Sequence, residues 1–199
     1  MKKAIIFILI GMLVIGVIRF ATFEDESVHY HANFKLVIDG QKWEFSQPIY
    51  MEETTSCSTA NGNRPEDRVH LHNLDGGSVH VHDRGATWGH LLSNLGFVVS
   101  NQSLSTDRNQ VYIDGVEGKR LTFILDGKPV STIYNQRIER TSKLLIAYGK
   151  YELLDLDKFY KEIPDTAATL DHSFDPASCS GSLHVPDNFF KKFWFVLWH

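Results

Sequence analysis

The sequence VHLHNLDGGSVHVH, from Val69 to His82, alternates aliphatic residues with histidines on both sides of a glycine-rich centre. Side chains two residues apart in a β-strand project to the same side of the sheet. The stretch therefore predicts a β-hairpin with one aliphatic face and one histidine face. The aliphatic face is suited to a hydrophobic core, and the other face presents four imidazoles together.

The loop of this hairpin sets its register. A three-residue loop, Asp75-Gly76-Gly77, would place His72 opposite His80. In the same register His70 would lie opposite His82, so that all four imidazoles share one face. A two-residue loop at the glycines would shift the register by one residue and scatter histidines over both faces. We therefore expect the three-residue loop, with its last glycine in a left-handed conformation.

A third His-x-His pair, His29 and His31, comes earlier in the chain, before a mostly apolar stretch at 34–38. Neutral imidazole is the most common metal ligand and suits zinc, copper, iron and nickel. Solvated surface histidines or a pH sensor are the alternatives, but charging six clustered imidazoles would be self-repulsive. The pairs predict a copper or zinc centre, either one crowded site or two sites of three ligands. The predicted ligands are His29, His31, His70, His72, His80 and His82.

The chain opens with a membrane-targeting pattern, in which Lys2 and Lys3 precede an apolar run over 4–18. No small-x-small cleavage pattern follows the run, which favours a retained anchor over a cleaved signal peptide. If the Arg19 side chain reaches the membrane surface, residues 4–23 supply the roughly twenty residues that span a bilayer. The two lysines predict a cytoplasmic N-terminus. We therefore expect a single-pass protein of the cell membrane with an extracytoplasmic domain.

The formal charge argues against nucleic acid as a partner. The whole chain carries −4 at pH 7 with neutral histidines, and residues 1–20 hold three basic and no acidic residues. The rest of the chain therefore carries −4 minus 3, or −7. Bound metal cations would offset part of this negative charge.

Cys57 and Cys179 are the two cysteines, and both lie beside serines. In an oxidising compartment they predict one disulfide, which would tie the C-terminal part of the chain to the first half. Free thiols that bind a metal are the alternative, and they would favour Cu(I) or zinc.

Composition divides the chain into four segments. They are a membrane anchor over 1–23, a histidine-rich β half over 24–100, a second strand-rich half over 101–150, and a C-terminal extension over 151–199. The predicted fold class is α+β: an N-terminal transmembrane helix, then a strand-rich mixed or antiparallel sheet domain with short helices. The second half has the order of turns and strands of a β-grasp-like domain.

Several elements can be placed from local patterns. Thr87 as N-cap and Gly96 as a stop predict a short helix, and Trp88, Leu91, Leu92 and Leu95 share its apolar face. A hairpin is expected at 33–38 and 42–45, turned at Asp39-Gly40, with a second turn at Asp126-Gly127. Further strands are expected at 96–99, 111–114, 121–125, 130–134 and 144–148, and a helix interrupted at Pro164 is expected over 151–168.

The last segment, 189–199, is rich in aromatic residues beside Lys191 and Lys192. It is too short to span a membrane, but such a segment can lie in the membrane interface. Packing on the domain, or on a protein partner in an oligomer, is the alternative.

Several motifs resemble those of a family of N-terminally membrane-anchored, His-x-His-rich extracytoplasmic proteins from candidate-phylum bacteria with reduced genomes. The resemblance runs through HYHANF at 29–34, VHLH at 69–72, VHVH at 79–82 with TWG at 87–89, LLIAYG at 144–149 and DPASCSG at 175–181. It implies the same three histidine pairs and an extracytoplasmic domain. It implies no particular reaction, and it does not extend to the aromatic segment.

Three classes of function follow. The first is a membrane-tethered extracytoplasmic protein that binds copper or zinc. The second is a metal-dependent hydrolase or lyase, because three-histidine coordination leaves an open position, with Asp75 or Asp83 as the nearest candidate base. The third is a structural or adhesive interaction domain. The chain has no His-Glu-x-x-His, no Gly-x-Ser-x-Gly and no phosphate-binding glycine loop, which favours binding over catalysis and assigns no catalytic residue.

Overall fold

The computed structural model describes residues 28–52 and 65–172, together with Gly11, Ile15 and Phe20. The residues described between 28 and 172 belong to one compact unit, which contains the elements described below. Within the described part of the chain, no helix is long and apolar enough to cross a membrane. The predicted anchor over 4–23 lies almost wholly outside the described residues, as do the two cysteines and the aromatic segment.

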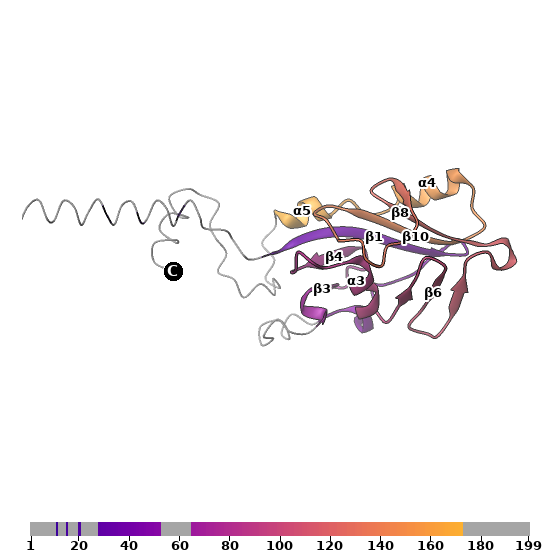
Figure 1. Cartoon of the computed structure of the whole chain (residues 1–199), viewed down its shortest axis with the longest axis horizontal. Helices are drawn as coiled ribbons and strands as arrows, with labels where there is room; N and C mark the ends of the chain where they lie inside the picture. Colours follow the sequence, from indigo (N-terminus) through magenta and orange to yellow (C-terminus); the bar gives the residue numbers. More distant parts are fainter. Residues whose placement is uncertain (1–10, 12–14, 16–19, 21–27, 53–64, 173–199) are drawn as a thin grey trace, which may run out of the picture. The chain divides into compact units, whose positions relative to one another are not determined.

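A mixed seven-stranded sheet forms the centre of this unit (Figure 1). Its strand order is β3-β4-β1-β10-β8-β9, with β2 paired to β1. The central pair, β1 and β10, is parallel, and the other pairs are antiparallel. The strands are β1 (Tyr30–Ile38), β2 (Gln41–Lys42), β3 (Val69–His70), β4 (Ser78–Val81), β8 (Arg120–Leu125), β9 (Lys128–Val130) and β10 (Lys143–Gly149).

The remaining described elements are short. An antiparallel three-stranded sheet contains β5 (Val98–Val99), β6 (Ser103–Ser105) and β7 (Val111–Ile113). The helices are α3 (Trp88–Asn94), α4 (Leu153–Lys161) and α5 (Ala167–Asp171), with 3-10 turns η1 (Pro48–Tyr50), η2 (Pro65–Asp67) and η3 (Val116–Gly118). The predicted α+β class with mixed sheets and short helices is confirmed. The helical segment predicted over 151–168, with its interruption at Pro164, is formed as two helices, α4 and α5, on either side of Pro164.

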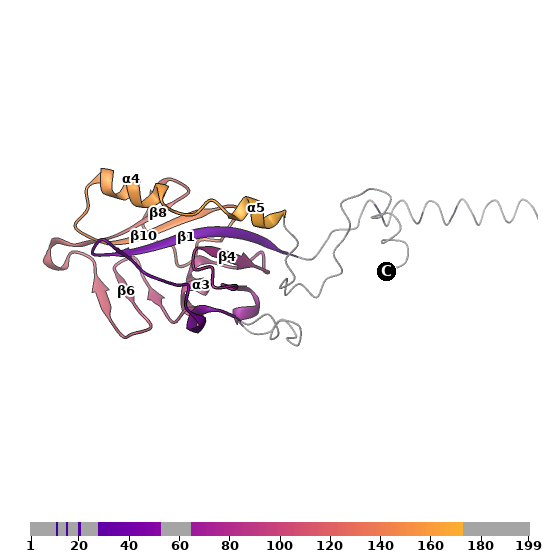
Figure 2. The same ribbon diagram turned by 180° about the vertical axis from the view of Figure 1, so that it is seen from behind.

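The two faces of the main sheet carry different layers. Helices α4 and α5 lie on one face, and α3 lies with the small sheet on the other (Figures 1 and 2). Alternate residues of β1 serve the two layers: Phe34 and Leu36 join the large core, while Val37 packs with Leu156 of α4 in a smaller one. The histidine side chains project from the same face as Val37, because they share its parity along the strands.

Helix α3 forms as the sequence predicts. The Thr87 side chain accepts a hydrogen bond from the His90 main-chain N–H, and the Thr87 N–H donates to His90 Nδ1, which completes a capping box. The four apolar residues of the predicted face are 0–5% exposed. A Cβ on Gly89 would lie 2.4 Å from the Tyr134 carbonyl oxygen, so only glycine lets this helix approach that loop.

The predicted register of the histidine hairpin is wrong by two residues. His70 lies opposite His80, and the turn is made by Asn73 and Leu74, both with positive φ. The three-residue loop with a left-handed Gly77 is therefore not formed. The glycines serve close packing instead, because a Cβ on Gly76 would lie 2.6 Å from the Ser46 nitrogen. A shift of two residues keeps every side chain on its predicted face, so the histidine face is retained.

Candidate metal centre

The six predicted ligands form one patch across three adjacent strands. His31 of β1 lies opposite His80 of β4, which in turn lies opposite His70 of β3. His29 precedes β1 and His82 follows β4, and their ring centroids are 4.9 Å apart. His72 follows β3, and its ring lies 3.4 Å from that of His80. The structure thus brings together all six histidines that the sequence singles out.

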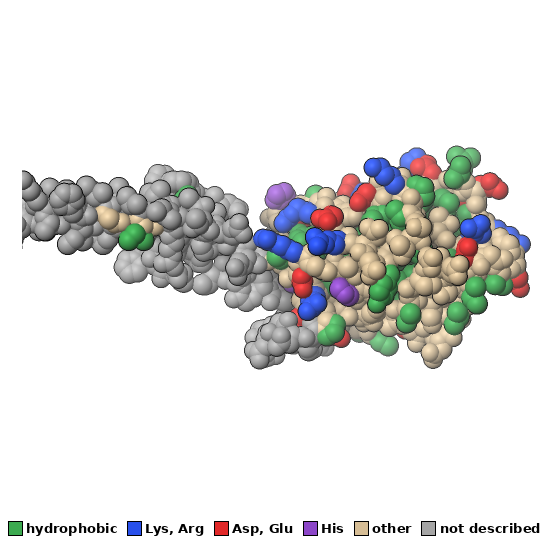
Figure 3. All heavy atoms as spheres, in the orientation of Figure 1, with side chains coloured by type: hydrophobic (Ala, Val, Ile, Leu, Met, Phe, Trp, Pro, Cys, Tyr) green, Lys and Arg blue, Asp and Glu red, His purple; other side chains and the backbone are tan. Residues whose placement is uncertain are grey.

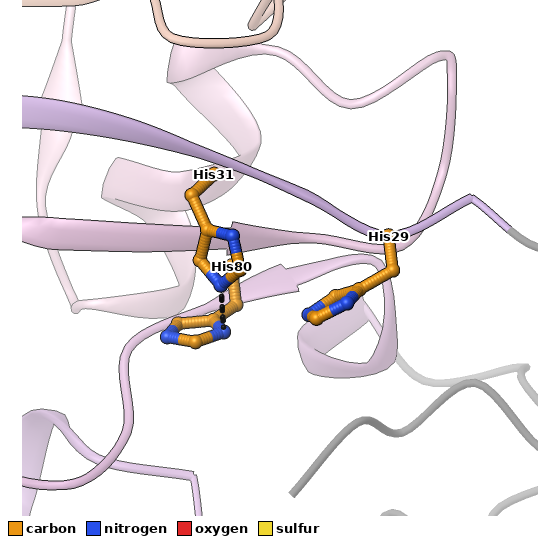
Figure 4. Close-up of side chains that lie close together, drawn as sticks. All are labelled: His29, His31 and His80. Carbon is orange, nitrogen blue, oxygen red and sulfur yellow. Dashed lines mark hydrogen bonds between the residues drawn. The ribbon is translucent and has the colours of Figure 1, made fainter. Parts of the chain in front are cut away.

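Three of these side chains form a group that can hold a metal ion. His29, His31 and His80 each offer one ring nitrogen, and these nitrogens all lie within 4.8 Å of one another. The three rings project to the same side of their strands (Figure 4). The ring centroids of His29 and His31 are 4.8 Å apart, and those of His31 and His80 are 4.3 Å apart. Strand β1 with the residue before it, and strand β4, therefore bring together three imidazoles that could bind one ion after rotation of their rings.

Two imidazoles converge on a single nitrogen of His80. The His80 Nδ1 atom lies 3.0 Å from His31 Nε2 and 2.7 Å from His72 Nε2. A neutral ring carries a proton on one nitrogen only, and one N–H makes a good hydrogen bond with only one of these neighbours. A metal cation accepts lone pairs from several nitrogens at once. One proton on His80 Nδ1 satisfies only one of the two contacts, whereas a cation among these nitrogens could satisfy several of them.

The His31 ring is held in position by Asp171 of α5. Its Nδ1–H donates to Asp171 Oδ1 at 2.7 Å, and the His31 main-chain N–H donates to the same oxygen at 2.8 Å. The other carboxylate oxygen accepts from Arg140 at 2.6 Å, and the Asp171 side chain is 4% exposed. A carboxylate on one imidazole nitrogen fixes the tautomer that presents the other nitrogen to a metal, and it raises the basicity of the ligand.

A similar contact orients His70. Its Nδ1–H donates to the Glu66 carbonyl oxygen of η2 at 2.7 Å. This bond makes Nε2 the nitrogen with a lone pair. Burial lowers the pKa of His70, and the neighbouring His72 lowers it further, while the Glu66 carbonyl and nearby carboxylates oppose the shift. The ring is therefore held neutral, as a metal ligand requires.

His82 lies between His29 and His70, with ring centroids 4.9 and 5.1 Å away. Both of its ring nitrogens are buried and make no hydrogen bond within the described part of the chain. Burial and the four neighbouring histidines lower the pKa of His82 to about 2. This imidazole is therefore neutral at physiological pH, with both nitrogens available to a ligand.

Polar side chains close the patch on the side of α5. Asn33 donates to Thr166 Oγ1 at 2.9 Å and accepts from the Ala167 main-chain N–H at 3.0 Å. Ser78, the next residue on this face of β4, bonds Thr166 at 2.7 Å. These contacts satisfy the buried polar groups and fix α5, and thus Asp171, against the sheet.

The histidine patch is mostly buried. His31, His70, His72 and His80 are 0–4% exposed. Figure 3 accordingly shows little histidine surface on the face in view, where acidic and basic side chains are interspersed. Electrostatic interactions are stronger in such a site than in water, so an occupying cation would be strongly held by the neutral rings and the Asp171 carboxylate.

Some candidates from the sequence do not join the patch as proposed. Asp75 Oδ1 accepts the main-chain N–H groups of Gly77 and Ser78, and Asp83 Oδ1 accepts that of Gly85, so both carboxylates stabilise turns. The cysteines lie outside the described residues, so their disulfide stays a prediction. The sequence missed Asp171, which is 140 residues from its partner His31 and has no motif around it.

Comparisons with known proteins add no assignment. No family model, no curated protein and no solved structure matches this chain. The predicted family resemblance and the β-grasp-like description of the second half therefore stay predictions, and the case for function rests on the geometry of the histidine patch.

Proposed function

We propose that this protein is a metal-binding protein in which His29, His31 and His80 hold a copper or zinc ion. The observation that carries the proposal is the convergence of three ligand nitrogens within 4.8 Å on two adjacent strands. The hydrogen bond that fixes the His31 ring and the 3.0 Å distance between His31 Nε2 and His80 Nδ1 support it further. Such a centre would serve metal storage, metal delivery or a structural purpose in the protein.

The donor set favours copper or zinc over iron. Imidazole suits both metals, whereas non-haem Fe(II) sites generally add a carboxylate ligand. The carboxylate of Asp171 contacts one of the three ligands, His31. One of its oxygens accepts a hydrogen bond from His31, and the other accepts one from Arg140. It therefore serves as an outer partner of His31 rather than as a ligand, which leaves a site made of nitrogen donors.

We further propose that the centre is tethered outside the cytoplasm by a single membrane-spanning segment over 4–23. The lysine pair before the apolar run, the missing cleavage pattern and the two cysteines support this location. Protease added to spheroplasts would then degrade the histidine domain and spare a small N-terminal fragment. Full protection while a known external protein is digested would refute the orientation.

A metal-dependent enzyme is the second candidate function. Three protein ligands leave an open position on a zinc or copper ion, which a catalytic site uses for water or substrate. The two carboxylates proposed as bases from the sequence are engaged in turns. Hydrolase or lyase activity that depends on the loaded metal would favour this candidate, whereas stoichiometric metal without turnover favours a binding protein.

The metal content of the native protein tests the proposal. Full-length protein, purified in detergent without affinity histidines, should contain at least one equivalent of copper or zinc by elemental analysis. His31→Ala should lose this metal, while His90→Gln, a change at an exposed helix position, should retain it. Protein that is isolated without metal, and that binds neither Cu²⁺ nor Zn²⁺ on titration, would overturn the proposal.

A further inference from the structure

We infer that the patch holds two metal ions, with a second position formed by His70, His72 and His82 beside the first. This inference rests on the proposed function of the first group. The group of His29, His31 and His80 leaves three histidines on or beside β3 and β4 unused, and the two sets touch each other through His72 and His80 and through His29 and His82. Each set would supply three imidazole nitrogens.

The ring spacings fit two such sets. Two imidazoles bound to one tetrahedral metal, with nitrogens about 2.0–2.1 Å from it, have ring centroids about 5 Å apart. In the second set, the His70 centroid lies 5.1 Å from that of His82 and 5.8 Å from that of His72. In the first set, the corresponding distances are 4.8 Å from His29 to His31 and 6.0 Å from His29 to His80. The nitrogens of the second set do not converge as those of the first set do, so its rings would have to rotate about their side-chain bonds to meet at one ion.

Each set contains one ring that is already oriented by an outer partner. Asp171 holds His31 in the first set, and the Glu66 carbonyl holds His70 in the second. In both contacts Nδ1–H donates the hydrogen bond, so the lone pair of Nε2 is the one that can bind a metal. Metal-binding histidines almost always donate their other N–H in this way. The same chemical arrangement thus occurs once in each set.

His82 gives the second position its independent support. Both of its ring nitrogens are buried without a hydrogen bond in the described part of the chain, and the first group does not use them. A buried polar group without a partner destabilises a fold. A metal ion between His70 and His82 would satisfy one of these nitrogens.

The two positions would lie close together. His72 Nε2 in the second set and His80 Nδ1 in the first are 2.7 Å apart. If these atoms bind their metals at about 2.0–2.1 Å, the two ions are separated by at most about 7 Å. Two Cu²⁺ ions at this distance interact magnetically, which gives the inference a spectroscopic signature.

Titration of the full-length protein with Zn²⁺ and, separately, Cu²⁺ tests the inference. We expect two equivalents in the native protein and in the exposed-site control His90→Gln, and one equivalent in His82→Leu. The spectrum of the two-equivalent Cu²⁺ form should show a half-field electron paramagnetic resonance signal, which is absent at one equivalent. If His82→Leu does not fold, as judged by circular dichroism, His82→Gln takes its place.

The possible outcomes are distinct. One equivalent in the native protein would overturn the second position and leave the proposed function standing. No bound metal would overturn both. Two equivalents without magnetic coupling would also overturn the inference, because the second ion would then lie elsewhere on the chain.

Discussion

Replacing Asp171 by asparagine should weaken metal binding with little loss of fold. The carboxylate accepts the Nδ1–H of His31 at 2.7 Å and a bond from Arg140 at 2.6 Å. The amide oxygen can still accept from His31, but the negative charge that raises the basicity of the ring is lost. Loss of such an outer partner costs about 10–100-fold in metal affinity, or about 1.4–2.7 kcal/mol.

Competition with a coloured chelator measures this change directly for Zn²⁺. Asp165→Asn is the matched control, because Asp165 lies just before the same helix, is 80% exposed and pairs with Lys143 at 3.0 Å. We expect the control to bind as the native protein does. An affinity for Asp171→Asn within about threefold of the native value, in a folded variant, would refute the role assigned to this carboxylate.

Three further predictions follow from the same geometry. His80→Ala, which removes the ring contacted by both His31 and His72, should lower Zn²⁺ affinity more than about 100-fold in the same chelator assay, since an inner ligand matters at least as much as an outer one. In the metal-free protein the pKa of His82 is about 2 in the folded state, below its ordinary value of 6.5. Below about pH 6.5 the unfolded chain therefore binds a proton at His82 that the folded chain does not. The free energy of unfolding falls as the pH drops below this value. Urea denaturation should show about 2 kcal/mol lost from this group between pH 7.5 and pH 5, and an unchanged stability would contradict its burial. Gly89→Ala should destabilise the fold by about 1–3 kcal/mol, because the new Cβ would collide with the carbonyl oxygen of Tyr134 in the facing loop. If the variant unfolds at the same midpoint temperature as the native protein, that close approach is refuted.

The faces of the strands could be predicted from the sequence, but the register of the hairpin could not. Alternation with a period of two assigns His70 and His80 to one face in any register that differs by an even number of residues. The choice between such registers depends on the turn. Asn73 and Leu74 adopt positive φ there, and leucine gives no signal of this conformation.

Long-range contacts were the other part that the sequence did not reveal. The capping residue and apolar spacing of α3 are local, and the helix was predicted within a residue of its bounds. The parallel pairing of β1 with β10 joins residues more than a hundred positions apart. Asp171 reaches the patch only because Thr166 and Ala167 dock on Asn33 of β1, a contact between segments that share no motif.

X-ray absorption spectroscopy of the metal-loaded, full-length protein distinguishes a histidine centre from a cysteine centre. We expect a first shell of nitrogen or oxygen scatterers at about 2.0–2.1 Å, with the outer-shell pattern of imidazole rings and no sulfur. The signal should change when His31 or His80 is replaced. A sulfur shell at about 2.3 Å would instead assign the metal to the cysteines and contradict the histidine centre.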